Sequence, residues 1–180
     1  MLPAEVQTGH IPSITHKMDE KEISKSSGFT LIELIVVFSV ISILSTLGVA
    51  AFVDYSRTQA LQTSTNDFVN TLNLAKGRAL SQVKPSECTQ EALSGYRVEI
   101  LDKSTYKLSV VCTNTYKVSQ FSLPTNITFN MVKITTPIFF PIISSGVAGY
   151  GNTEMTAYGK SRCVTVSSGG IILQTTAACP

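Results

Sequence analysis

The pattern of apolar and polar positions divides the chain into stretches of different character. Residues 1–28 are polar and show no sustained period. Residues 29–53 are apolar except for one charged residue, Glu33, and a few hydroxyl residues, which membrane helices tolerate. An apolar run of this length can cross a bilayer as a helix. We therefore predict a polar leader, disordered or removed, over residues 1–28 and a transmembrane helix over residues 29–53.

Residues 54–84 extend the helix with an apolar stripe. Apolar side chains recur there every three, four or seven positions, with polar residues between them: Leu61, Phe68, Leu72, Ala75, Ala79 and Val83. This spacing predicts an amphipathic helix that packs one face on a soluble domain. Pro85 lacks the amide hydrogen that a helix interior requires, so we expect the helix to end at about Val83.

Beyond Pro85 the apolar period changes to two, which is typical of strands. The segments "GYRVEIL" and "TYKLSVVCT" alternate in this way and are joined by "DKS", so they predict a hairpin. Six further strands are expected at "YKVSQFSL", "NITFNMV", "IFFPII", "TEMTAY", "RCVTVSS" and "GIILQT", with a tight turn at residues 167–170. The predicted fold class is α+β: a long N-terminal transmembrane-plus-amphipathic helix, then an antiparallel β-sheet domain of six to eight strands over residues 85–180.

Composition excludes several kinds of chemistry. The only histidines, His10 and His16, precede the apolar run, so residues 29–180 contain no imidazole for a catalytic triad or a histidine zinc site. The carboxylates of the strand-rich region show no paired spacing typical of a hydrolase: Glu87, Glu91, Glu99, Asp102 and Glu154. Residues 29–180 carry 11 Lys/Arg and 8 Asp/Glu, and this net charge of +3 is too small to indicate nucleic-acid binding by itself. We expect no enzyme activity, no metal site and no cofactor.

The four cysteines show no C-x-x-C spacing. Their even number, in a chain whose bulk has the character of an exported domain, favours two disulfides in an oxidising compartment over four buried thiols in the cytosol. Three pairings are open. We favour the sequential pairing, Cys88 with Cys112 and Cys163 with Cys179.

The stretch "GFTLIELIVVFSVISIL" resembles the class III signal sequence of type IV pilins and type II secretion pseudopilins. The resemblance rests on Gly28, Phe29, Glu33 and the apolar run behind them. It implies that prepilin peptidase cuts between Gly28 and Phe29 on the cytoplasmic side and methylates the new amino group of Phe29. A charged residue inside a membrane helix costs roughly 2.5–3.5 kcal/mol, so Glu33 needs a partner. The amine of a neighbouring subunit would supply one and would set the axial register of a filament.

Two other interpretations of this segment remain open. Glu33 could be an incidental acid near the lipid headgroups, or residues 1–51 could form a secretory signal peptide with Val49 and Ala51 before the cleavage point. The apolar run exceeds the usual length of a signal peptide, and the amphipathic stripe continues directly from it. The chain also departs from many pilins, which carry a proline where this one has Ala50.

A second, weaker resemblance covers "FFPIISSGVAGYGN" and the closing "RCVTVSSGGIIL" hairpin, which look like the minor pseudopilin H and FimT-like minor pilin group. There the closing turn commonly contains Gly-Arg, whereas here it is Gly169-Gly170. The resemblance implies a minor pseudopilin or minor pilin of a type II secretion pseudopilus or type IV pilus, which supports protein secretion or pilus biogenesis. Its partners would be prepilin peptidase and other pilins, and its location the bacterial inner membrane, single-pass, with the C-terminal domain in the periplasm or outside the cell.

The alternative function is a DNA-binding minor pilin of a competence pilus. Lys160 and Arg162, with Lys133, would then contact phosphates without reading sequence. Ordinary solvated surface charge is the simpler explanation of so few basic residues.

Overall fold

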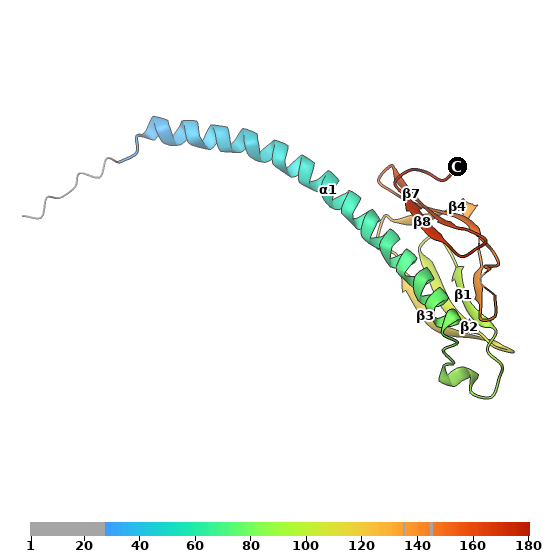
Figure 1. Cartoon of the computed structure of the whole chain (residues 1–180). Coiled ribbons are helices and arrows are strands. Elements are labelled where there is room, and N and C mark those ends of the chain that lie inside the picture. The colour runs from blue at the N-terminus through green and yellow to red at the C-terminus, as the bar shows by residue number, and fades with distance from the viewer. Residues whose placement is uncertain (1–27, 135, 145) are drawn as a thin grey trace, which may run out of the picture. The chain divides into compact units, whose positions relative to one another are not determined.

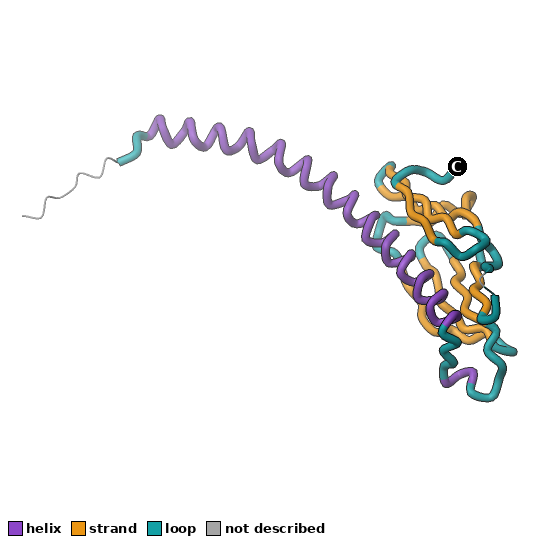
Figure 2. Tube along the Cα trace, viewed as in Figure 1, coloured by secondary structure: helices purple, strands orange, loops and turns teal. Residues whose placement is uncertain are grey.

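The computed structural model describes residues 28–134, 136–144 and 146–180, and the side chains of residues 46–48, 133 and 134 lie outside this description. The predicted leader, apart from Gly28, therefore lies outside the described residues. The chain divides into two units, up to Ile43 and from Leu44 onward. One helix contributes to both units, and all the strands belong to the second (Figures 1 and 2).

Helix α1 spans Leu31–Leu80. It ends before the expected position because a turn closes it ahead of Pro85. The N–H of Gln82 donates to the carbonyl of Ala79 and the N–H of Val83 to that of Arg78, both at 3.0 Å, while Gln82 adopts a φ of 50°. These two bonds form a Schellman motif, which satisfies the last carbonyls of a helix. Val83 is 47% exposed and lies outside the core, so its assignment to the apolar stripe is wrong.

The other members of the apolar stripe are buried, and Phe68, Leu72 and Ala75 are fully so. In the second unit this face of α1 packs on the strands, as Figure 1 shows for the green part of the helix. A short 3₁₀ helix, η1 (Ser86–Cys88), follows α1 and leads to the first strand.

Within the described residues, eight antiparallel strands form two four-stranded sheets. The first sheet has the order β3-β2-β1-β5 and the second β4-β6-β7-β8. In chain order the strands are β1 (Gly95–Ile100), β2 (Thr105–Val111), β3 (Thr115–Ser122), β4 (Thr128–Ile134), β5 (Ile138–Pro141), β6 (Gly151–Ala157), β7 (Lys160–Val166) and β8 (Ile172–Thr175). The α+β class is confirmed. The expected hairpins are present, with Val98 opposite Leu108 in β1–β2 and Val166 opposite Ile172 in β7–β8.

The division into two sheets differs from the single sheet expected. After β3 the chain turns at Pro124, whose carbonyl accepts from the N–H of Ile127 at 3.2 Å, and Asn126 takes a φ of 70°. Asparagine tolerates this left-handed conformation better than most residues. The turn removes β4 from the edge of the first sheet, and β4 pairs instead with β6, with Phe129 opposite Met155.

An aromatic cluster joins α1 to both sheets. Phe68 of α1 lies edge-on to Tyr106 of β2 and to Phe129 of β4, with ring centroids 5.2 and 5.3 Å apart. Tyr106 in turn stacks on Phe121 of β3 at 5.0 Å. Because Phe68 is the helix residue that contacts rings of both sheets, this cluster holds the three layers of the second unit together.

Candidate functional site

The first turn of α1 is built by a local capping interaction. Gly28, Phe29 and Thr30 precede the helix, and the N–H of Glu33 donates to Oγ1 of Thr30 at 3.2 Å. The N–H of Leu34 donates to the carbonyl of Thr30, also at 3.2 Å. Thr30 is therefore the N-cap, and the sequence Thr-Leu-Ile-Glu has the form of a capping box. The sequence interpretation missed this role of Thr30, although the T-x-x-E spacing signals it.

Glu33 sits at the third position of the helix, where a negative charge interacts favourably with the N-terminal end of the helix dipole. Phe29, 81% exposed, and Glu33 border the same shallow hollow on the helix surface, together with Val37. Phe29 lies before the first helical residue, so the shared hollow, and not helical spacing, shows that the two side chains are close together. An amino group created at Phe29 would be near this hollow. In the described part of the chain Glu33 forms no ion pair.

The apolar part of α1 has the length and composition to cross a membrane, and its most apolar window has no buried residues. Two of the hydroxyl groups in it are satisfied within the helix. Ser39 donates to the carbonyl of Val36 at 2.7 Å and Ser42 to that of Phe38 at 2.8 Å. Such bonds remove the cost of placing a free hydroxyl in hydrocarbon. This helix fits membrane anchoring.

Lys160 and Arg162 contact the helix. Nζ of Lys160 donates to Oδ2 of Asp54 at 2.8 Å and to Oγ1 of Thr58 at 2.7 Å. Nη2 of Arg162 donates to Oε1 of Gln62 at 3.1 Å, and Arg162 is only 9% exposed. Both cations therefore hold β7 against α1. The hypothesis that they contact DNA loses its support, and the side chain of Lys133 lies outside the described residues.

Sequence reasoning did not identify the helix residues in these contacts. Asp54, Thr58 and Gln62 recur every four residues, which is a signal for one helix face. Nearby, the guanidinium of Arg57 lies 4.9 Å from the ring centroid of Tyr158, in the turn between β6 and β7. This cation–π contact adds a second link between α1 and the β6–β7 hairpin.

The structure contains two disulfides, Cys88–Cys112 and Cys163–Cys179, which is the sequential pairing. The first joins η1 to the end of β2, with Cα atoms 6.1 Å apart, and the second joins β7 to the C-terminal segment, with Cα atoms 5.0 Å apart. Among the described residues no group of three or more histidine, cysteine or acidic side chains is placed to hold a metal ion.

A capped, apolar N-terminal helix followed by a disulfide-linked antiparallel domain defines a pilin-like layout. Residues 23–49 match the family model described as the prokaryotic N-terminal methylation motif. The matched range includes Gly28, Phe29, Thr30 and Glu33, and it supports a structural subunit of the pilin or pseudopilin type. No curated protein and no solved structure matches the chain.

Proposed function

We propose that this protein is a minor pilin or minor pseudopilin, a filament subunit that is assembled through its N-terminal helix. Prepilin peptidase cuts between Gly28 and Phe29 and methylates the amine of Phe29. Residues 29–53 then hold the protein in the bacterial inner membrane as a single span, and the strand-rich domain lies in the periplasm or outside the cell.

The observation that carries this proposal is the match of residues 23–49 to the methylation motif, at the point where α1 begins. The capping bond from Glu33 to Thr30 supports it further. It keeps the first turn of the helix formed next to the cleavage point, so that the charges at Phe29 and Glu33 have defined positions.

Glu33 acts in assembly by pairing with the methylated amine of a neighbouring subunit. N-methylation preserves the positive charge of that amine. When apolar helices bundle side by side, the only favourable axial offset is one that brings each carboxylate to an amine, because an unpaired charge in an apolar bundle is costly. This pairing sets the step between subunits.

Within this class the minor pseudopilin H and FimT-like group is the subgroup that the C-terminal hairpin resembles. The filament is a type II secretion pseudopilus or a type IV pilus, and the subunit supports secretion or pilus biogenesis. The competence alternative, a DNA-binding minor pilin, is not favoured, because Lys160 and Arg162 are engaged with α1. The motif likewise favours a structural subunit over an enzyme.

The test is N-terminal sequencing combined with intact mass of the protein extracted from membranes. The proposal expects a chain that begins with N-methylated Phe29. A chain that begins at Phe52 would select the secretory signal peptide instead, and an uncleaved Met1 would contradict both. Normal processing of a Gly28→Ala variant would show that the peptidase does not require Gly28.

A further inference from the structure

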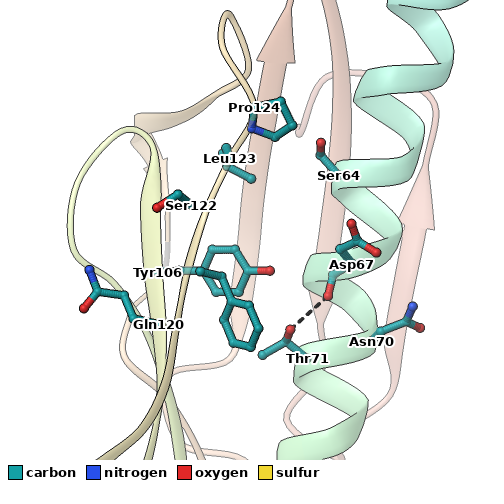
Figure 3. Close-up of a pocket in the computed structure, with 10 residues that line it drawn as sticks. Ser64, Asp67, Asn70, Thr71, Tyr106, Gln120, Ser122, Leu123 and Pro124 are labelled. Carbon is teal, nitrogen blue, oxygen red and sulfur yellow. Dashed lines mark hydrogen bonds between the residues drawn. The ribbon is translucent and has the colours of Figure 1, made fainter.

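A groove in the second unit has no role in the proposed assembly. It lies between α1 and the end of β3 and has a volume of about 460 Å³ (Figure 3). Residues from two turns of the helix form one wall, and the segment from Gln120 to Pro124 forms the other. Tyr106 of β2 lies between the two walls.

Buried residues that carry hydroxyl groups form the floor of the groove, and one of them, Tyr106, is aromatic. Ser64, Thr71 and Tyr106 are 4%, 6% and 2% exposed. Burial raises the pKa of Tyr106, a hydrogen bond with Thr71 lowers it, and the charge of Asp67 raises it. The phenol is therefore neutral at physiological pH and can accept as well as donate a hydrogen bond. Phe121 stacks on Tyr106 and forms an apolar border.

The rim of the groove is polar and carries one negative charge. Asp67, Asn70 and Gln120 are exposed there, and Asp67 is the only charged residue among the described residues that line the groove. Its carboxylate makes no hydrogen bond or ion pair within the described chain, although its backbone carbonyl accepts from Thr71. The groove thus combines an unpartnered carboxylate, acceptor oxygens and aromatic rings, which together suit a cation.

The β3 wall adds main-chain hydrogen-bonding groups. β3 is the outer strand of its sheet, with β2 as its strand partner among the described residues. Its outward N–H and C=O groups can pair with an added strand, a known mode of peptide recognition. An extended peptide rises about 3.3 Å per residue, so three or four of its residues would span the two helical turns that border the groove, about 10 Å.

We propose that this groove binds an extended segment of a partner protein that presents a lysine or arginine side chain. The segment pairs with the free edge of β3, its cationic group meets Asp67, and the methylene stem of that side chain contacts Phe121. This goes beyond the proposed filament function, because it identifies the chemistry of a partner that the domain recruits and does not require processing at Gly28.

The experiment uses the full chain in detergent micelles. The ligands are fluorescently labelled heptapeptides of alternating serine and valine, acetylated and amidated at their ends. The central residue of each peptide is lysine, norleucine or glutamate. Fluorescence anisotropy measures the affinity. We expect the lysine peptide to bind best, and Asp67→Asn to weaken its binding about fivefold, as for a partly screened ion pair. Asn70→Asp, which adds a carboxylate to the same rim, should strengthen binding by a similar factor.

Glu87→Gln is the matched control, since it removes an exposed carboxylate on η1 that does not line the groove. It should leave the affinity unchanged. N-methylation of alternate backbone nitrogens of the lysine peptide should abolish binding if the peptide pairs with β3. Equal affinity for the lysine and norleucine peptides, an unaltered affinity of Asp67→Asn, or no binding of any peptide at millimolar concentration would overturn the proposal. None of these outcomes bears on the N-terminus found by sequencing, so the two proposals fail separately.

Discussion

The ammonium group of Lys160 lies 2.8 Å from the carboxylate of Asp54, a residue 106 positions earlier in the chain. This ion pair joins the start of β7 to α1 in the second unit, and Thr58 accepts a further hydrogen bond from the same ammonium group. A basic residue that sequence reasoning considered for DNA contact thus serves to dock the helix on a sheet.

Lys160→Met should therefore lower the free energy of unfolding, by about 1 kcal/mol or less, because both partners are substantially exposed, at 40% and 68%. The effect should shrink as salt increases. Denaturant unfolding followed by near-UV circular dichroism of tyrosine measures it, since the chain has six Tyr and no Trp. Lys117→Met, at an exposed position of β3, is the control and should be neutral. Salt-sensitive DNA retardation that disappears only in Lys160→Met would restore the DNA-binding alternative.

The proposed charge pairing of Glu33 can be tested apart from capping, because the capping bond comes from the backbone N–H of Glu33, which every substitution here keeps. Glu33→Ala removes the whole polar side chain, whereas Glu33→Gln keeps a polar side chain of similar size and removes only the charge. We expect both variants to insert in the membrane and both to be strongly depleted from filaments. The measurement is the ratio of protein in sheared filaments to protein in membranes. Normal incorporation of Glu33→Gln would contradict the ion-pair role.

Asp102 should contribute to acid sensitivity. Its carboxylate accepts from the hydroxyl of Thr105 at 2.6 Å and from the N–H of Ser104 at 2.7 Å. These bonds lower its pKa to about 2, with the Thr105 hydroxyl as the main cause. An unfolded Asp titrates near 3.9, so the stabilisation is complete above about pH 5 and is lost as the pH falls from about 4 to 2.

Asp102→Asn should flatten the fall of the melting temperature over this interval, measured between pH 5 and pH 2. Thr105→Val should raise the pKa of Asp102, followed by NMR titration of its carboxyl carbon. An Asp102 pKa near 4 in the unaltered protein would show that the turn does not hold the carboxylate as described.

Phe68 should be among the most costly residues to truncate. It is fully buried and contacts rings from both sheets. Phe68→Ala should lower the free energy of unfolding by about 3–5 kcal/mol, and Phe68→Leu by less, because leucine refills part of the cavity. Leu74→Ala, on the same helix at 44% exposure, is the control and should cost much less. Equal effects at the two positions would mean that Phe68 is not central to the core.

Local patterns were enough to predict the elements. The helical stripe of Leu61, Phe68 and Leu72, the alternation in β1 and β2, and the Gly28-Phe29-Glu33 spacing all depend on residues a few positions apart. Helix and strand periods are properties of such short segments, so the α+β class was readable from the sequence. The end of α1 could not be predicted from the sequence. Gln82 occupies the position of positive φ in the C-terminal turn where glycine is usual, and glutamine has no marked preference for this conformation.

Only the tertiary structure decided which distant segments meet. The sequence predicted strands on both sides of Pro124 but could not assign β3 and β4 to different sheets, since the alternation of side chains does not specify the partner of a strand. Cysteine spacing left three pairings open, and the fold brings Cys88 to Cys112 and Cys163 to Cys179. The pairing of Lys160 with Asp54 and the groove beside Asp67 also arise from packing between segments that are far apart in the sequence. Burial of the whole core selects these contacts, because local preferences do not extend over such distances.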